Sequence, residues 1–175
     1  MAAQDRYWDT GPFLAWLKEE AHRLADVEPV IKAAESGRVR LITSSVTLIE
    51  VVKLDQKHAA IAVPPEDAEK IRQYFLRSYI SIRVFDRPTA TLARQLIWEH
   101  NLKTRDAMHL ATAVRWRIPL LETFDGDDLI PLSGMVGNPA IEIRPPRWDP
   151  LPEDEDEGVL GGLQTSLGFD EEPPE

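Results

Sequence analysis

Short apolar runs alternate along this chain with longer segments in which hydrophobic residues recur at helical spacing. The first apolar run ends at Trp8, and Asp9 stands between it and a helix whose start is signalled by Pro12. Apolar residues then line one helical face as far as Leu24, which predicts a single helix that fades only at Asp26. The chain therefore opens with a strand, an acidic residue and a helix.

The same alternation continues to the C-terminus. Further strands are predicted over residues 39–43, 80–85, 118–124 and 141–143. Helices are predicted over residues 27–36, 46–54, 88–101 and 106–116, with another after Pro65. The helix over 46–54 is apolar on nearly every side, which predicts that it is buried, and the alternation within 80–85 predicts an edge strand.

Strands separated by helices of this length imply right-handed crossovers and a mostly parallel sheet with helices on both faces. The predicted fold is a three-layer α/β/α sandwich. Ligands bind at the carboxyl ends of parallel strands, so Asp9 makes the first strand a candidate for the centre of the sheet. Neither a GxGxxG nor a GxxxxGK[ST] motif occurs, and dinucleotide and P-loop functions therefore lack support.

The composition fits one globular domain, with 175 residues of which 43% are hydrophobic. No run approaches the ~18 apolar residues of a membrane span, and the N-terminus lacks the features of a signal peptide. A cytoplasmic location without membrane association is expected. Because the chain has no cysteine, any metal must be held by oxygen or imidazole, which favours a hard cation.

The net charge of −10 is concentrated at the C-terminus. Residues 147–175 hold ten acidic residues and one basic residue, which leaves 20 acidic and 19 basic residues in residues 1–146. The nearly neutral first segment is predicted to be the folded domain. The second is predicted to be a disordered acidic tail, because its Pro, Gly, Asp and Glu residues cannot bury enough apolar surface.

Four acidic residues are candidates for chemistry, and three of them have simpler structural explanations. Asp9 could merely cap the first helix, Asp106 could merely complement a helix dipole, and Asp125 could merely build a turn with Gly126. Glu50 differs because it lies among apolar residues, where an unpaired carboxylate is costly to bury without a cation or a hydrogen-bond partner. Parallel topology brings the other three to one edge of the sheet, and this coincidence favours a shared site.

The chain resembles the PIN-domain nucleases, and among them the VapC-like toxins of toxin–antitoxin pairs. The resemblance is carried by four segments that occur in the order typical of that family: YWDTGPFLAWL, ITSSVTLIEVV, LKTRDAMHLATAV and LLETFDGDDL. It covers roughly residues 5–145 and implies a sheet of strand order 3-2-1-4-5. It also implies that the protein is a metal-dependent endoribonuclease.

Carried over position by position, the resemblance implies a set of catalytic and metal-binding acids with supporting polar side chains. The acids are Asp9, Glu50, Asp106 and Asp125, and the supporting groups are the hydroxyls of Thr10, Thr47 and Thr123. The chain departs from the family pattern at Gly11, where Asn is usual, at Glu122, where an apolar residue is usual, and in its acidic tail.

Clustered carboxylates select Mg²⁺ or Mn²⁺, which can activate water for attack on a phosphodiester. Asp9 and Asp106 are predicted to be direct ligands, Asp125 a direct or water-mediated ligand, and Glu50 the group that holds the water or a second metal. The adjacent acids at 127 and 128 are interpreted as loop surface.

His109 lies one helical turn after Asp106, on the same face. It could be a metal ligand, but a supporting role within the core is favoured because imidazole suits softer metals. Lys53, Lys103 and Arg105 flank the predicted site and could contact RNA phosphates, although scattered basic residues are usually only solvated surface.

The predicted function is that of a toxin ribonuclease inhibited by a cognate antitoxin, and a homodimer is left open. A groove between the first two helices and the helix after Pro65, around Trp16, Val30, Ile31 and Phe75, is a candidate for binding an amphipathic antitoxin segment. One alternative is a PIN-like nuclease without an antitoxin. Another is a non-catalytic module that binds a metal or a partner.

Overall fold

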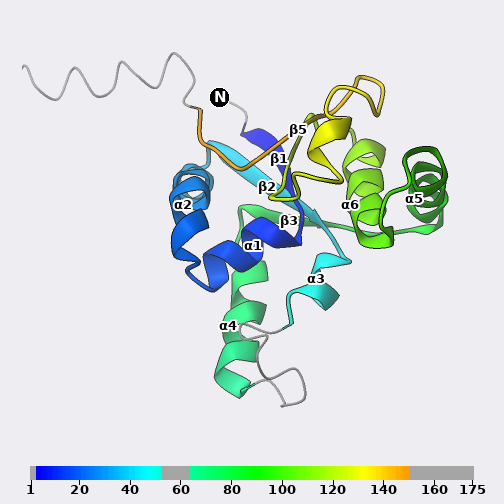
Figure 1. Cartoon of the computed structure of the whole chain (residues 1–175). Coiled ribbons are helices and arrows are strands. Elements are labelled where there is room, and N and C mark those ends of the chain that lie inside the picture. The colour runs from blue at the N-terminus through cyan, green and yellow to red at the C-terminus, as the bar shows by residue number, and fades with distance from the viewer. Residues whose placement is uncertain (1–2, 53–63, 150–175) are drawn as a thin grey trace, which may run out of the picture.

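A five-stranded, all-parallel sheet forms the centre of the protein in a computed structural model that describes residues 3–52 and 64–149 (Figure 1). The strands are β1 (Gln4–Trp8), β2 (Val39–Ser44), β3 (Ile80–Arg83), β4 (Leu120–Glu122) and β5 (Glu142–Arg144). Their order is β3-β2-β1-β4-β5. The central place of β1 and the strand order implied by the family resemblance are confirmed, and β3 is an edge strand as predicted.

Helices cover both faces of the sheet (Figure 1). They are α1 (Thr10–Leu17), α2 (Ala21–Glu35), α3 (Thr47–Glu50), α4 (Pro65–Phe75), α5 (Arg87–His100), α6 (Thr104–Arg115) and the 3-10 turn η1 (Ile130–Leu132). Successive strand residues face opposite layers, so Trp8 packs with α1, α2 and α4, whereas Tyr7 packs with α5 and α6. The three-layer α/β/α sandwich is confirmed. Among the described helices, none combines the length and apolar character needed to cross a membrane.

The long first helix predicted from the sequence is wrong, because the chain turns between α1 and α2. Glu19 adopts a left-handed conformation with φ of 53°. The Glu20 N–H bonds the Ala15 carbonyl at 2.9 Å, and the Glu19 N–H bonds the Trp16 carbonyl at 3.1 Å. These bonds form a Schellman motif, which ends a helix and is usually signalled by glycine. Here Glu19 occupies the position where glycine is usual, so the sequence does not signal the end of the helix.

The buried helix predicted over residues 46–54 is also wrong within the described residues. α3 has four residues, and Leu48, Ile49 and Val52 are 42%, 73% and 47% exposed. Only the side that carries Val46, Thr47 and Val51 is buried. This short turn therefore carries Glu50 at the surface end of β2 and does not bring it into the core.

The groove predicted for an antitoxin segment exists between α1, α2 and α4, but three of its predicted residues do not line it. Val30 and Ile31 are fully buried, and Phe75 is 7% exposed. The hollow is lined by the predicted Trp16 and by other residues of these helices and the adjoining turns: Leu17, Glu19, Leu24, Glu28, Lys70, Gln73, Tyr74 and Arg77.

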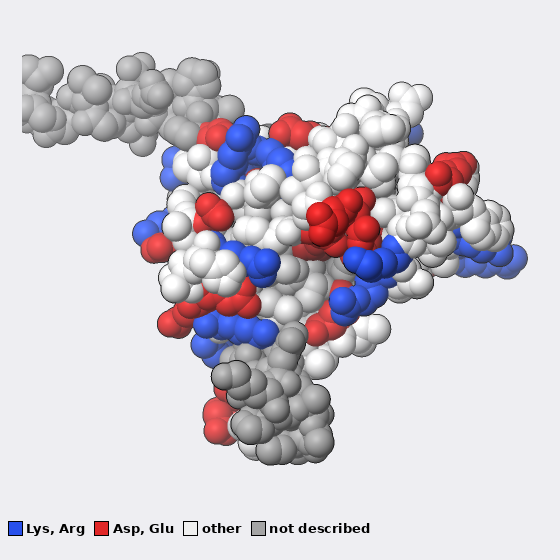
Figure 2. Space-filling view, viewed as in Figure 1, with Lys and Arg blue, Asp and Glu red and all other residues white. Residues whose placement is uncertain are grey.

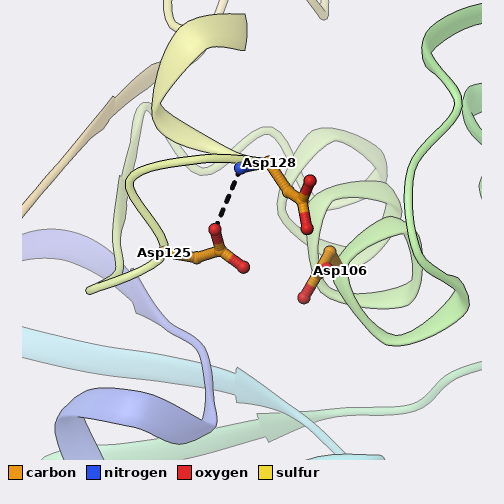
Figure 3. Close-up of side chains that lie close together, drawn as sticks. All are labelled: Asp106, Asp125 and Asp128. Atoms are coloured by element: carbon orange, nitrogen blue, oxygen red, sulfur yellow. Dashed lines mark hydrogen bonds between the residues drawn. The ribbon is translucent and has the colours of Figure 1, made fainter.

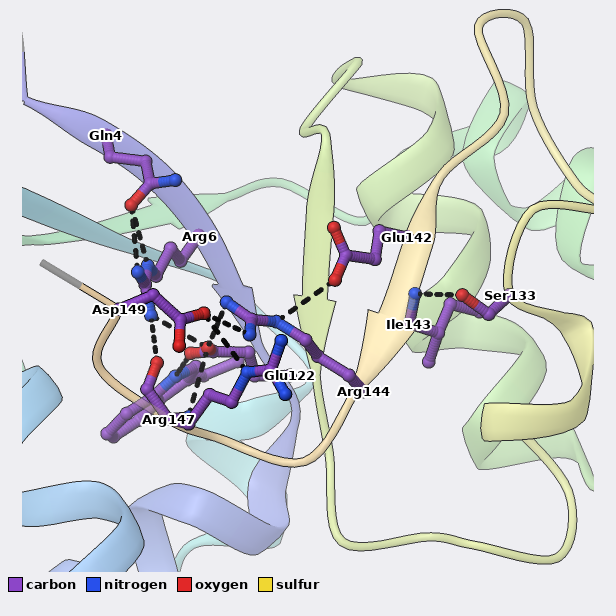
Figure 4. A network of polar contacts seen from close by, with 10 residues as sticks. Gln4, Arg6, Glu122, Ser133, Glu142, Ile143, Arg144, Arg147 and Asp149 are labelled. Atoms are coloured by element: carbon purple, nitrogen blue, oxygen red, sulfur yellow. Dashed lines mark hydrogen bonds and ion pairs between the residues drawn. The ribbon is translucent and has the colours of Figure 1, made fainter. Parts of the chain in front are cut away.

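Glu122, the acid in a usually apolar position, is fully buried and has specific partners. It lies 2.8 Å from Arg6 Nη1 and accepts a hydrogen bond from Trp8 Nε1 at 2.7 Å. Arg6 also donates to the Arg147 carbonyl at 2.6 Å, so the pair extends to the C-terminal segment (Figure 4). A charge buried here is tolerated because its oxygens are paired.

Candidate active site

Asp9 lies at the carboxyl end of β1 and is 8% exposed. Its Oδ1 accepts a hydrogen bond from the Gly11 backbone N–H at 3.0 Å, so it does cap α1. Its Oδ2 accepts a hydrogen bond from the Thr123 hydroxyl, which links it to the end of β4. Burial raises the pKa of Asp9, because the hydrogen bonds and the nearby His109 only partly offset the loss of solvent.

Gly11 lies tightly against Asp9. A Cβ atom at this position would be 3.3 Å from Asp9 Oδ1 and 3.7 Å from Phe124 Cδ2. The asparagine usual at this position would therefore require its neighbours to move by a few tenths of an ångström. Glycine leaves the space above the Asp9 carboxylate open to the pocket.

Three further carboxylates gather beside the end of β4 (Figure 3). Asp106 comes from the first turn of α6, and Asp125 and Asp128 come from the loop after β4. One oxygen of each lies within 4.8 Å of the others. Asp125 Oδ1 accepts the backbone N–H of Asp128 at 2.9 Å, so this acid also builds its turn. The cluster thus includes Asp128, which the sequence assigned to loop surface.

The surroundings of Asp106 disfavour its ionised form. Burial raises its pKa, and the neighbouring charges of Asp125 and Asp128 raise it further. Its Oδ2 is buried and has no hydrogen-bond partner within the described part of the chain. A buried acceptor of this kind needs a cation or a proton.

Glu50 reaches the pocket from the end of α3, with its side chain 9% exposed. Its Oε2 accepts a hydrogen bond from the Thr10 hydroxyl and lies 2.8 Å from His109 Nε2. Its Oε1 lies 3.5 Å from Arg105 Nε and makes no hydrogen bond in the described residues. Burial alone would raise the pKa of Glu50, but hydrogen bonds from His109 and Thr10 lower it overall.

Both ring nitrogens of His109 are occupied by protein groups. Nδ1 lies 2.9 Å from the Tyr7 hydroxyl, and Nε2 faces Glu50. The ring is 3% exposed and packs edge-on against Tyr7. In this arrangement neither nitrogen is available to a metal, which favours the supporting role over the ligand role.

One pocket collects nearly all the residues predicted from the sequence. Its lining contains Asp9, Thr10, Gly11, Leu14, Arg23, Glu50, Lys103, Arg105, Asp106, His109, Thr123, Phe124, Asp125, Gly126 and Asp127. Thr47 does not line it. The Thr47 hydroxyl is buried against that of Thr43 at 2.6 Å, and Thr43 donates to the Trp8 carbonyl, so this pair supports the strand end before Asp9. Lys53 lies outside the described residues.

Basic side chains stand beside the acids on the surface (Figure 2). Lys103 pairs with Asp128, and Arg105 pairs with Glu50. Arg23, from α2, lies with its guanidinium 4.6 Å from the centre of the Phe124 ring. Arg23 was not predicted from the sequence, because only the turn after α1 brings it to the pocket.

The chain matches the family model for the PIN domain over residues 6–130. A comparison with curated proteins found no match. Among solved structures, a toxin–antitoxin complex from Klebsiella pneumoniae is 23% identical, with a TM-score of 0.52, over 74% of this chain and 92% of that chain. VapC20 from Mycobacterium tuberculosis, a toxin that cleaves the sarcin–ricin loop, is 17% identical, with a TM-score of 0.55, over 70% of this chain and 91% of that chain.

VapBC2 from Rickettsia felis, bound to a DNA fragment from its promoter, is 14% identical, with a TM-score of 0.54. The similarity covers 80% of this chain and 98% of that chain. The TM-scores of these three structures show a shared fold, and the family model spans most of the sheet and every acid of the pocket. The chain belongs to the PIN domain family.

Proposed function

We propose that the protein is a metal-dependent endoribonuclease that uses Mg²⁺ or Mn²⁺ and acts as the toxin of a toxin–antitoxin pair. The observation that carries the proposal is a pair of buried carboxylate oxygens, Asp106 Oδ2 and Glu50 Oε1, that make no hydrogen bond in the described residues. Both line the pocket that also holds Asp9 and Asp125.

The donor set of this pocket fits a hard divalent cation. Its acidic residues offer only oxygen atoms, and Mg²⁺ and Mn²⁺ prefer oxygen ligands. The Asp106, Asp125 and Asp128 oxygens lie within 4.8 Å of one another, a spacing that one cation can bridge. Burial raises the pKa values of Asp9 and Asp106, and the charges of neighbouring acids raise them further, so a cation in the pocket would favour the ionised form of both.

When bound, the cation supplies positive charge to the phosphodiester and acidifies a water molecule. Asp106, Asp125 and Asp9 hold it, with Asp128 as an additional ligand from the same loop. Glu50 would present Oε1 to the attacking water or to a second cation. Thr123 and Thr10 keep the Asp9 and Glu50 carboxylates in place through their hydroxyl groups.

RNA is the proposed substrate because the basic side chains at the pocket stand where a phosphate backbone would cross it. Arg105 and Lys103 flank the acids on α6 and just before it, and Arg23 flanks them from α2. Lys53 is proposed as a further contact. VapC20, which shares the fold, is a toxin that cleaves the sarcin–ricin loop, and this supports the proposed substrate class here.

Cleavage by the full-length protein tests the proposal. Single-stranded or loop RNA should be cut with Mg²⁺ or Mn²⁺, and EDTA should abolish the activity. Asp106→Asn should lower the cleavage rate by about 100-fold or more, because it removes a charged ligand while keeping the shape of the side chain.

Asp26→Asn is the matched control, since Asp26 is exposed on α2 and does not line the pocket. Its rate should equal that of the wild type. Cleavage that persists in EDTA, or an unchanged rate for Asp106→Asn, would contradict the metal mechanism. The complete absence of cleavage, with cation binding retained, would favour the non-catalytic binding module.

The antitoxin is proposed because solved structures with this fold include toxin–antitoxin complexes. The groove between α1, α2 and α4 offers apolar side chains beside Lys70 and Arg77, which suits an amphipathic segment with acidic residues. A PIN nuclease without an antitoxin remains the alternative, and the gene next to this one distinguishes the two.

A further inference from the structure

Four side chains form one continuous row along the wall of the pocket, and two of them, Tyr7 and His109, are buried. The Tyr7 hydroxyl lies 2.9 Å from His109 Nδ1, and His109 Nε2 lies 2.8 Å from Glu50 Oε2. The Thr10 hydroxyl donates to the same oxygen of Glu50. The row joins β1, α6, α3 and α1, so it depends on four separate parts of the fold.

The chemistry of the two ends fixes the direction of the hydrogen bonds in this row. Oε2 of Glu50 already accepts the hydrogen of the Thr10 hydroxyl, and a carboxylate oxygen accepts hydrogen bonds and does not donate them. His109 Nε2 must then carry the hydrogen that faces Glu50. A neutral imidazole has a single N–H, so Nδ1 accepts, and the Tyr7 hydroxyl donates to it.

The two carboxylate oxygens of Glu50 consequently differ in their hydrogen bonds. Oε2 receives two hydrogen bonds, from Thr10 and His109, whereas Oε1 makes none within the described residues and lines the pocket beside Arg105. α3 is too short to hold the side chain by itself, since the turn has four residues and its apolar side chains are largely exposed. The orientation of Glu50 therefore depends on contacts from outside α3.

We propose that His109 is a positioning residue: in the Nε2–H tautomer set by Tyr7, it holds Oε2 of Glu50 and thereby presents Oε1 alone to the cation and substrate. The proposal rests on the proposed function for the identity of that ligand. The tautomer and the orientation of Glu50 do not depend on whether the protein cleaves RNA. The role also differs from that of a metal ligand, because both ring nitrogens are used within the protein.

The tautomer is tested by NMR of full-length, metal-free protein labelled with ¹⁵N-histidine. The His109 ring signals are identified by their loss in His109→Gln. We expect Nε2 to carry the proton and Nδ1 to show the shift of an unprotonated nitrogen that accepts a hydrogen bond. A proton on Nδ1 in the neutral ring would overturn the proposal.

The positioning role is tested by Mn²⁺ binding, measured by electron paramagnetic resonance. In His109→Gln the amide N–H can still reach Glu50, whereas the shorter side chain of His109→Asn can reach only toward Tyr7. Groups that orient metal ligands typically change metal affinity by about 10–100-fold when removed. We expect a loss in that range for His109→Asn and an affinity close to wild type for His109→Gln.

Tyr7→Phe provides a second variant that keeps the ring and removes one hydroxyl. It should weaken Mn²⁺ binding severalfold, because Nδ1 loses its donor and the imidazole is no longer held in place. Wild-type affinity in both His109→Asn and Tyr7→Phe, with folding verified by circular dichroism, would overturn the proposal. Neither measurement uses RNA, so failure of the positioning role is distinguishable from failure of the nuclease function.

Discussion

The acids of the pocket differ in whether the fold stabilises or destabilises their ionised form. Burial raises the pKa values of Asp9 and Asp106, and neither has a basic side chain as a hydrogen-bond partner in the described residues. Glu50 has His109, Thr10 and Arg105, and its pKa is lowered. Without a cation the folded protein therefore stabilises the charge of Glu50 and opposes the charge of Asp106.

This difference predicts opposite stability changes for two isosteric substitutions in metal-free buffer at neutral pH. Asp106→Asn should raise the melting temperature, because it removes a charge that the fold opposes. Glu50→Gln should lower it, because it removes a charge that Thr10 and His109 stabilise. Each change should be about 2–4 °C, which corresponds to about 1 kcal/mol in a protein of this size. Differential scanning calorimetry measures both.

The contributions of Asp106 and Glu50 to stability should also change in opposite directions with pH. A raised carboxyl pKa means that the folded state binds the proton more tightly, so the contribution of Asp106 to stability falls as pH rises above about 4. The advantage of Asp106→Asn should therefore grow from acidic to neutral pH. The contribution of Glu50 is present above about pH 4 and is lost as pH falls further. Equal melting temperatures for wild type and both variants across pH would contradict this assignment.

The sequence predicted four acids of the site but missed the contribution of Asp128. Asp9, Glu50, Asp106 and Asp125 were found because strand ends and an apolar segment carried carboxylates, and the structure places all of them in one pocket. The entry of Asp128 into the cluster depends on the turn that the Asp125 carboxylate builds. Such contacts arise from loop geometry, which residue spacing does not determine.

At the scale of elements, the turn at Glu19 shapes a second surface. It ends α1 and redirects α2, so that Trp16 and Leu24 line a hollow together with Tyr74 from α4. The sequence predicted a groove between these helices from their apolar faces. Val30 and Ile31 nevertheless face the sheet, because the unpredicted break changes which side of α2 is exposed.

We predict that Trp16→Glu weakens binding of the cognate antitoxin and leaves RNA cleavage unchanged. Trp16 lines the groove but not the acidic pocket. A tryptophan at the centre of an interface commonly contributes about 2 kcal/mol or more, which is about 30-fold in affinity. Isothermal titration calorimetry with the co-expressed, purified antitoxin measures the loss.

Trp98→Glu is the matched control, since Trp98 lies on α5 on the opposite side of the sheet and is 72% exposed. It should bind the antitoxin as the wild type does. If Trp98→Glu weakens binding as much as Trp16→Glu, or if neither does, the groove is not the antitoxin site.

The predictions for elements failed where a local signal was missing or ambiguous. Gly37 correctly marked the end of α2, with φ of 78°, but no glycine marks the end of α1, where Glu19 takes the same conformation. The apolar run over residues 46–54 predicts a buried helix, yet Leu48, Ile49 and Val52 lie at the surface. Hydrophobicity alone cannot distinguish a buried helix from an exposed apolar turn.

At the scale of the whole molecule, the first residues of the C-terminal segment are held against the folded domain. The Trp148 ring contacts the Arg6 guanidinium at 5.2 Å and that of Arg38 at 5.0 Å. Asp149 pairs with Arg144 and Arg147 (Figure 4). The residues up to 149, which the sequence assigned to the tail, thus pack against the domain. A truncation that tests the tail must therefore spare them.

We predict that deletion of residues 150–175 lowers the apparent KM for RNA severalfold at low salt. The deleted segment holds nine acidic residues and no basic residue, and it is tethered to a domain whose proposed substrate, RNA, is a polyanion. Its charge should repel RNA or compete for Lys103 and Arg105. The Debye length shrinks to about 10 Å at 0.1 M salt, so the difference between full-length and truncated protein should shrink as salt rises.

A full-length variant with residues 153–157 changed to their amide counterparts separates charge from chain length. It removes five of the nine acidic residues and keeps the segment, so an electrostatic effect predicts a KM between those of the full-length and truncated proteins. If this variant behaves like the wild type while the deletion lowers KM, the segment acts by excluded volume or by docking of its apolar residues 159–169. If KM is the same for all three proteins across the salt series, the acidic segment has no role in RNA binding, and its charge serves solubility or another partner.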